Sequence, residues 1–223
     1  MARKIMIIGG GIAGLSTGCY GRMNGYETEI FEMHTLPGGV CTGWKRKGYT
    51  FDISMHILVG SKSGPFNRMW QELGAVQGRT FIDHEEYLRL TDGEKTLIVY
   101  TDPGRLEAHL LDLSPADAKL IRAFTRGIRQ FTRFDLSVLQ ETPKPLMTLF
   151  DWQRFGLRML PYLQPMLRWG MLPVRDFARQ FKDPFLRAAI PQMFSWEEAP
   201  VMMGMMLLAY MHKRNAGYPV GGS

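Results

Sequence analysis

Three glycines near the start of the chain have the spacing needed to bind a dinucleotide. Gly9, Gly11 and Gly14 form a GxGxxG pattern between an apolar run at 5–8 and a helical stretch. The first glycine permits a sharp turn, the second lets the backbone approach a pyrophosphate, and the third lets the helix lie close to the strand. Free N–H groups and the partial positive charge at the helix start would then attract the phosphates.

An acidic residue stands at the position where such sites bind a ribose. Glu32 ends a second apolar run and lies eighteen residues after Gly14, close to the spacing of about 20 residues at which this acid binds a ribose hydroxyl. The alternative interpretation is an ordinary glycine-containing turn followed by a surface glutamate. The residues that we predict to bind the cofactor in this stretch are Gly9, Gly10, Gly11, Ile12, Ala13, Gly14, Glu32 and Met33.

These residues require a strand, a tight turn, a helix and a second strand over residues 4–32. This order predicts a Rossmann-like βαβ unit of the α/β class within a chain that is α+β overall. We expect two strands of parallel character, which end near Ile8 and Phe31. Because a doubly wound sheet normally has more strands, with helices on both faces, we expect an incomplete fold and a truncated chain.

A second glycine pair and a short motif follow Glu32. Gly38, six residues later, is followed by Gly39, and residues 48–56 contain the pattern GYxFD and then His56. In this combination the sequence resembles the FAD-dependent amine oxidase and phytoene desaturase superfamily. The likeness is greatest to its phytoene dehydrogenase-like branch, which includes carotenoid desaturases, carotenoid isomerases and retinol saturases. The segment YPVGG at 218–222 is similar to one in the same branch.

The resemblance implies that the cofactor is FAD. In this family the glycine pair continues the cofactor site, which adds Gly38, Gly39 and His56 to the predicted binding residues. The sequence departs from the family at Val40, where the usual residue is basic, and at Ser54, where the branch often has glycine. His56 also fits the interpretation of a structural histidine, and no catalytic residue is assigned.

The resemblance further implies an enzyme. It would be an FAD-dependent oxidoreductase that transfers hydride between the flavin and a long apolar substrate of carotenoid or retinoid type. Two alternatives stay open, because the chain also fits a truncated dinucleotide-binding fragment without catalysis, or an amine oxidase-like flavoenzyme. The resemblance covers the whole chain, but only as the N-terminal part of longer family proteins.

The remainder of the chain has the mixed pattern of a hairpin and several helices. We predict a nucleotide-binding domain at 1–60 and a substrate or cap region at 61–223. Asp92 and Gly93 form a strong two-residue turn signal between two strand-like runs. An apolar helix near residue 205 fits either an ordinary core or the wall of a site for a long apolar substrate, because it is crowded by Met202, Met203, Met205 and Met206.

Residues 142–175 differ from the rest in charge. This stretch carries five basic residues against one acid, Asp151, among many apolar side chains. Such a segment can form a helical cap over a ligand cavity or make peripheral contact with a membrane. We expect Pro161, Pro165 and Pro173 to break it into short helices.

Composition and charge limit the classes of ligand and partner that we expect for this chain. The net charge of +6 and the isoelectric point near 9.4 suit an anionic ligand or membrane surface. We expect no nucleic-acid partner, because no base-reading module is recognisable, and we expect no metal site. Cys19 and Cys41 are too few for a disulfide scaffold, so a reducing, cytoplasmic location is the expectation.

Overall fold

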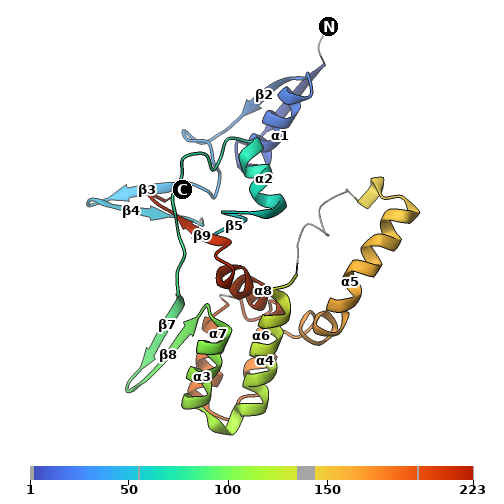
Figure 1. Ribbon diagram of the computed structural model, residues 1–223. Helices are drawn as coiled ribbons and strands as arrows, with labels where there is room; N and C mark the ends of the chain where they lie inside the picture. Colours follow the sequence, from blue (N-terminus) through green and yellow to red (C-terminus); the bar gives the residue numbers. More distant parts are fainter. Residues whose placement is uncertain (1–2, 55, 135–143, 195, 223) are drawn as a thin grey trace. The chain divides into compact units, whose positions relative to one another are not determined.

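The computed structural model describes residues 3–54, 56–134, 144–194 and 196–222 and divides the chain into two compact units (Figure 1). The first unit comprises Met1–Ile82 and Gly217–Ser223, and the second comprises Asp83–Ala216. Helices and strands alternate irregularly along the chain, which confirms the predicted α+β class. The predicted domain boundary near residue 60 stays a prediction.

The first unit begins with a parallel βαβ arrangement. Strand β1 (Lys4–Ile8) pairs with β2 (Glu27–Phe31) in parallel, and helix α1 (Ile12–Met23) connects them. Because side chains alternate along a strand, Ile5 and Ile7 of β1 both point toward α1. A Cβ added at Gly21 would lie 3.4 Å from Ile5, and a Cβ added at Gly14 would lie 3.3 Å from Ile7. The predicted Rossmann-like unit is therefore present.

The rest of the first unit consists of short elements. The hairpin formed by β3 and β4 is antiparallel, and β9 lies between β5 and β6 in a three-stranded sheet. Strand β9 thus completes a sheet whose other strands lie more than 130 residues earlier in the chain. The bounds are β3 Gly43–Arg46, β4 Tyr49–Asp52, β5 Leu58–Val59, α2 Gly64–Glu72, β6 Phe81–Ile82 and β9 Ala216–Pro219.

The second unit combines a hairpin with helices. Strands β7 and β8 are antiparallel, which confirms the predicted hairpin. Asp92, however, pairs with Lys95 as the last residue of β7, so the two turn residues are Gly93 and Glu94 instead of Asp92 and Gly93. The carboxylate of Asp102 caps α3 by accepting hydrogen bonds from the N–H groups of Gly104 and Arg105. The bounds are β7 Glu86–Asp92, β8 Lys95–Tyr100, α3 Pro103–Leu113, the short 3-10 helix η1 Pro115–Asp117, and α4 Ala118–Phe131.

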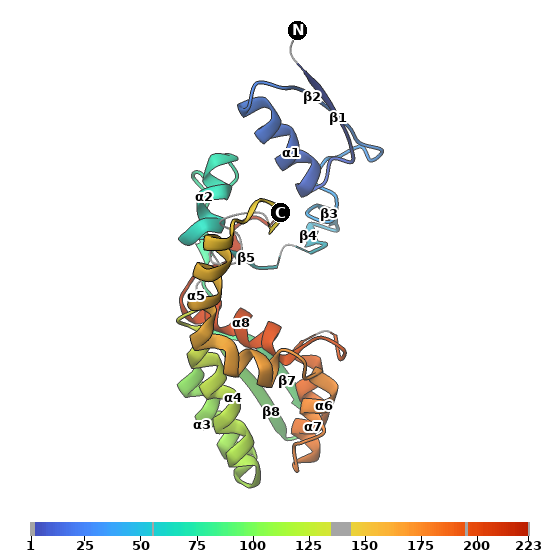
Figure 2. The same cartoon turned by 90° about the vertical axis from the view of Figure 1, so that its right-hand side faces the viewer.

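The main buried core belongs to the second unit. Aromatic rings fill it, with the ring centroids of Phe124 and Phe177 5.2 Å apart and those of Phe177 and Phe181 5.3 Å apart. Figure 2 shows α3 and α4 side by side, next to β7 and β8. The remaining helices of this unit are α5 Leu149–Trp169, after the 3-10 helix η3 Lys144–Leu146, then α6 Val174–Ala178, α7 Pro184–Gln192 and α8 Val201–His212.

Helix α5 corrects one prediction. It runs unbroken through Pro161 and Pro165, so the expectation that these two prolines divide it is wrong. Residues 142 and 143 of the predicted basic stretch lie outside the described residues. A capping box between Thr148 and Asp151 starts the helix, and burial of Pro165 and Trp169 holds its last turns. The missing N–H groups bend the axis instead of ending the helix (Figures 1 and 2).

Pro173, by contrast, lies beyond the end of α5 and is the N-cap residue of α6. Among the residues that the structure describes, no helix is both long and apolar enough to cross a membrane.

Candidate functional site

The turn between β1 and α1 requires glycine at two positions. Gly9 has a φ of +101°, which L side chains rarely adopt, and its N–H donates a hydrogen bond to the carbonyl oxygen of Phe31 at 2.7 Å. A Cβ on Gly14 would lie 1.9 Å from the carbonyl oxygen of Gly9. The helix can therefore lie against the turn only when residue 14 lacks a side chain.

The start of α1 is open toward a ligand. Gly11 is the N-cap residue, and no side chain caps the helix there. The N–H groups of the first turn, which include those of Ile12 and Ala13, have no acceptor within the helix. A Cβ on Gly11 would meet a single heavy atom within 4 Å, the Cα of Gly39 at 3.9 Å. This leaves room for an anion against uncovered backbone donors.

The carboxylate of Glu32 lies against the same turn. Its Oε2 accepts a hydrogen bond from the N–H of Gly10 at 2.5 Å, and its Oε1 accepts one from the N–H of His34 at 2.8 Å. The hydrogen bonds from His34 and then from Gly10 lower the pKa of Glu32 below its ordinary value. The group is therefore a charged acceptor whose position is fixed by two backbone donors.

The second glycine pair lies beside the first. The N–H of Gly38 donates a hydrogen bond to the carbonyl oxygen of Gly10 at 2.8 Å, and Gly38 forms a parallel bridge with Gly11. A Cβ on Gly39 would lie 3.1 Å from the Cα of Gly11. The structure thus brings the sequence-predicted residues Gly10, Gly11, Glu32, Gly38 and Gly39 together, and their role in cofactor binding stays a prediction.

Two other predicted residues have exposed side chains. Met33 follows Glu32 with a fully exposed side chain. His56 is exposed, and its backbone N–H donates to the carbonyl oxygen of Ser54 at 2.9 Å. The hydroxyl of Ser54 in turn donates to the carbonyl oxygen of Val40 at 2.9 Å. The two positions at which the sequence departs from the family pattern are therefore direct neighbours.

One pairing was missed by sequence reasoning. The hydroxyl of Tyr218 donates a hydrogen bond to Oδ2 of Asp52 at 2.9 Å, and this contact raises the pKa of Tyr218. The terminal YPVGG segment thus closes on the GYxFD motif. Both segments are recognisable in the sequence, but they are separated by 166 residues and no local signal pairs them.

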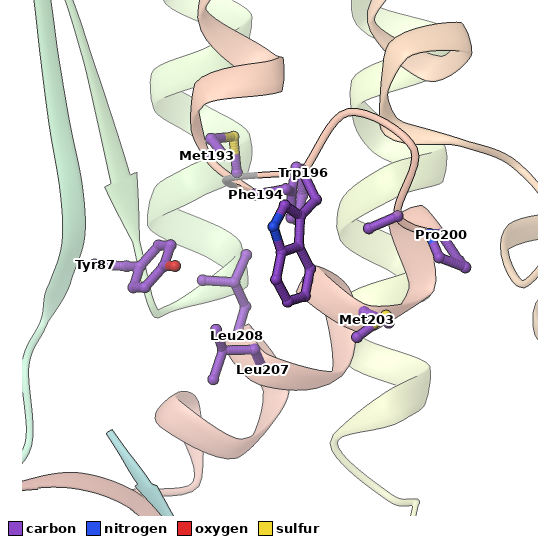
Figure 3. Close-up of a pocket in the computed structure, with 10 residues that line it drawn as sticks. Tyr87, Met193, Phe194, Trp196, Pro200, Met203, Leu207 and Leu208 are labelled. Carbon is purple, nitrogen blue, oxygen red and sulfur yellow. The ribbon is translucent and has the colours of Figure 1, made fainter. Parts of the chain in front are cut away.

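A mainly apolar cavity lies within each unit. In the first unit, a cavity of about 460 Å³ adjoins α1 and is lined, among others, by Ile12, Leu15, Cys19, Gly38, Leu58 and Trp70. In the second unit, a cavity of about 230 Å³ lies beside α8 (Figure 3). Its walls include Tyr87, Phe194, Trp196, Met203, Leu207 and Leu208.

The methionines of α8 divide between the two expected uses. Met205 is fully buried in the core of the second unit, whereas Met203 is 53% exposed and lines the cavity. Figure 3 shows Trp196 and Met203 on one side of this cavity and Tyr87 across from them. The helix thus supplies both core and cavity wall.

Comparison with known proteins supports the assignment of the first unit. Residues 7–73 match the family described as NAD(P)-binding Rossmann-like domain. This stretch covers the glycine turn, Glu32 and the second glycine pair. The predicted dinucleotide-binding domain is therefore confirmed.

The chain as a whole is similar to enzymes of carotenoid and retinoid metabolism. It is 25% identical over 202 residues to the phytoene desaturase (lycopene-forming) of Pseudescherichia vulneris, covering 84% of this chain and 37% of the relative. It is 28% identical over 232 aligned residues to prolycopene isomerase 1, chloroplastic, of an Oncidium hybrid cultivar, covering 97% and 38%. It is 23% identical over 230 residues to the inactive all-trans-retinol 13,14-reductase of Danio rerio, covering 98% and 37%.

These matches confirm the resemblance to the phytoene dehydrogenase-like branch. The chain spans less than two fifths of the length of these curated relatives.

Proposed function

We propose that this chain is the dinucleotide-binding part of an FAD-dependent oxidoreductase that acts on a long apolar substrate of carotenoid or retinoid type. The observation that carries the proposal is the cluster in which Gly10, Glu32 and Gly38 are joined by hydrogen bonds at the start of α1. Its support from outside the chain is the similarity to a phytoene desaturase and to a prolycopene isomerase.

The residues of the first unit fit a dinucleotide. Gly11 at the start of α1 leaves open space where a Cβ would stand, and the first-turn N–H groups are suitable donors for a pyrophosphate. Each oxygen of Glu32 holds one backbone N–H, and a carboxylate has about four acceptor positions. The carboxylate thus keeps acceptor capacity for a ribose hydroxyl.

This arrangement suggests which part of the reaction the cofactor would carry out and which groups of the protein would bind it. Bound FAD would supply the site that accepts or donates hydride. The start of α1 would hold the pyrophosphate, Glu32 would orient the ribose, and Gly38 and Gly39 would let the backbone run close to the cofactor. The cavity beside α8, lined by Trp196 and Met203, offers an apolar surface for part of the substrate.

The alternative is a module that binds a dinucleotide without turnover of its own. One observation favours it: on the face of β1 that points away from α1, Met6 is 70% exposed and Ile8 is 93% exposed. Parallel sheets are normally covered on both faces. An amine oxidase-like flavoenzyme would use the same first unit.

Flavin content tests the proposal. The purified 223-residue protein is incubated with FAD, desalted and examined by visible absorption. We expect a retained flavin band, and we expect Gly11→Val, which fills the open space at the helix start, to abolish it. Gly156→Ala in α5 is the control, because a Cβ there meets no atom within 4 Å and the backbone is already helical. A protein that is folded by circular dichroism but retains no flavin would contradict binding by this chain.

A further inference from the structure

The cavity beside α8 carries two polar groups in a wall that is otherwise apolar. They are the hydroxyl of Tyr87 and the indole N–H of Trp196, and Figure 3 shows both turned toward the space between the two side chains. Within the described part of the chain, neither group has a hydrogen-bond partner. A ligand in this cavity would therefore meet two hydrogen-bond donors among apolar side chains.

An irregularity in β7 presents the tyrosine. Glu86 pairs with Tyr100, and Leu88 already pairs with the next residue of β8, Val99, so β7 carries one extra residue at Tyr87. Such a bulge changes the direction of a side chain and is common beside functional sites. The ring packs against the core, and burial raises the pKa of the Tyr87 hydroxyl. The group therefore keeps its proton and can donate a hydrogen bond.

Backbone hydrogen bonds hold the loop that carries the tryptophan. The N–H of Trp196 donates to the carbonyl oxygen of Phe194 at 2.7 Å, and the N–H of Ala199 donates to the carbonyl oxygen of Trp196 at 3.1 Å. The N–H of Arg175 on α6 donates to the carbonyl oxygen of Glu197 at 2.9 Å. Trp196 is 69% exposed, so its ring lies at the mouth of the cavity on a fixed loop.

The inner wall and the volume limit what can enter. A Cβ on Gly204 would lie 1.5 Å from the ring of Phe194, so this ring rests directly on the backbone of α8. The cavity has a volume of about 230 Å³, which is below the range of about 300–1,000 Å³ of pockets that enclose a drug-sized ligand. It therefore accommodates one end of a long apolar molecule.

Charges beside the mouth select the kind of oxygen group. Glu197 and Glu198 follow Trp196 directly, and the guanidinium of Arg175 forms an ion pair with Glu198. These three charged groups sum to one negative charge, which would repel a carboxylate. A neutral carbonyl oxygen is not repelled, and its two lone pairs can accept from both donors at once.

We propose that the cavity beside α8 binds the ketone or aldehyde end of a long apolar molecule. Its carbonyl oxygen accepts hydrogen bonds from the Tyr87 hydroxyl and the Trp196 indole N–H, and its carbon chain lies against apolar side chains such as Met203. The inference rests on the proposed function and names the chemistry of one end of the substrate. A hydrocarbon end would cover both donors without pairing them, so the cavity distinguishes the two kinds of end.

Equilibrium dialysis with two matched ligands tests the proposal. The probes are geranylacetone, a neutral apolar ketone, and the hydrocarbon of the same skeleton with a methylene group in place of the carbonyl. Tyr87→Phe removes only the hydroxyl and should lower the affinity for the ketone about fivefold, because one hydrogen bond is lost. The affinity for the hydrocarbon should change less than twofold. Trp196→Phe should act in the same way, and the double variant should lower the ketone affinity about 25-fold.

Two controls accompany these variants. Trp152→Phe on α5 changes a partly exposed tryptophan of the same unit that does not line the cavity, and it should leave both affinities unchanged. A carboxylic acid of the same chain length should bind more weakly than the ketone at neutral pH, because of the negative charge at the mouth. An unchanged affinity for the hydrocarbon shows that each variant keeps the cavity intact.

Three results would overturn the proposal. The first is a wild-type protein that binds no ketone. The second is an equal loss of ketone and hydrocarbon binding in Tyr87→Phe and Trp196→Phe variants whose circular dichroism matches the wild type. The third is an equal loss of ketone binding in Trp152→Phe and Trp196→Phe.

Flavin content, measured on the same samples, separates this inference from the proposed function. The glycine turn belongs to the first unit and the cavity to the second. Selective loss of ketone binding in Tyr87→Phe, in a protein that retains no flavin, would contradict the proposed function but not the ligand class. Retained flavin without any distinction between ketone and hydrocarbon would overturn the ligand class alone.

Discussion

The close contact between α1 and the glycine turn can be tested by adding single methyl groups. A Cβ on Gly14 would lie 1.9 Å from the carbonyl oxygen of Gly9, whereas a Cβ on Gly18, on the same side of the helix, would lie 2.8 Å from the end of the Ile30 side chain. Backbone cannot move aside as a side-chain terminus can. Gly14→Ala must therefore push the helix more than about 1 Å from the turn, whereas Gly18→Ala requires a small rotation of Ile30.

The two variants should differ strongly in the free energy of opening of the first unit. Replacing glycine by alanine within a helix gains about 1 kcal/mol of helix propensity, and overpacking of a well-packed site costs about 1–3 kcal/mol or more. For Gly18→Ala the two terms nearly cancel. For Gly14→Ala we expect a net loss of about 2 kcal/mol, which corresponds to an opening equilibrium raised about 30-fold.

Amide hydrogen exchange followed by mass spectrometry measures this difference where it arises. Peptides that cover β1, α1 and β2 report the opening free energy of the first unit, separately from the second unit. Gly14→Ala should lose protection in these peptides and lose flavin retention, while Gly18→Ala should keep both. Equal protection in the two variants would refute the interpretation that the contact with the Gly9 carbonyl dictates glycine at position 14.

Three further predictions concern Glu32, Tyr218 and the cavity beside α8. Glu32→Gln should weaken FAD or ADP binding by calorimetry, because a neutral amide replaces the charged acceptor. Since hydrogen bonds depress the pKa of Glu32, the contribution of the carboxylate should persist above its ordinary pKa and disappear as pH falls through the lowered value. Tyr218→Phe and Asp52→Asn should each cost about 1 kcal/mol in opening free energy, and the double variant little more. Met203→Trp should weaken binding of a fluorescent polyene such as retinol, because it narrows the cavity.

Each of these has a matched control. Glu29→Gln removes an exposed acid that pairs with Lys4 on the same strand pair and should leave nucleotide binding unchanged. Full additivity of Tyr218→Phe and Asp52→Asn would mean that their hydrogen bond contributes nothing to stability. Met171→Trp changes an exposed methionine outside the cavity, so an equal loss of polyene binding in this variant would contradict the site.

The part of the fold that could be predicted from the sequence is the part governed by local pattern. The stretch from Lys4 to Glu32 combines two short apolar runs, a glycine turn between them and an acid at the expected distance from the glycines, and all of these act between near neighbours. The hairpin around Gly93 was predictable for the same reason, although its turn lies one residue later than expected. Gly21 was overlooked because it falls outside the motif. A Cβ there would lie 2.7 Å from the Thr28 side chain, about as near as a Cβ on Gly18 would lie to Ile30.

Predictions failed where packing overrides a local rule. Pro161 and Pro165 ordinarily end a helix, but α5 continues because its end is buried at Pro165 and Trp169. The contact between Asp52 and Tyr218 depends on how β9 returns to the first unit. The proximity of Ser54 to Val40 likewise appears only once the loop is folded.

The return of β9 to the first unit has a consequence for biosynthesis. The second unit is one continuous segment, Asp83–Ala216, so it can fold as soon as it has left the ribosome. The sheet that contains β5 and β6 needs Gly217–Pro219 between these strands, and these residues are synthesised after the whole second unit. Strands β5 and β6 must therefore wait through the translation of more than a hundred residues before their sheet can form, whereas β1 and β2 pair with each other without β9.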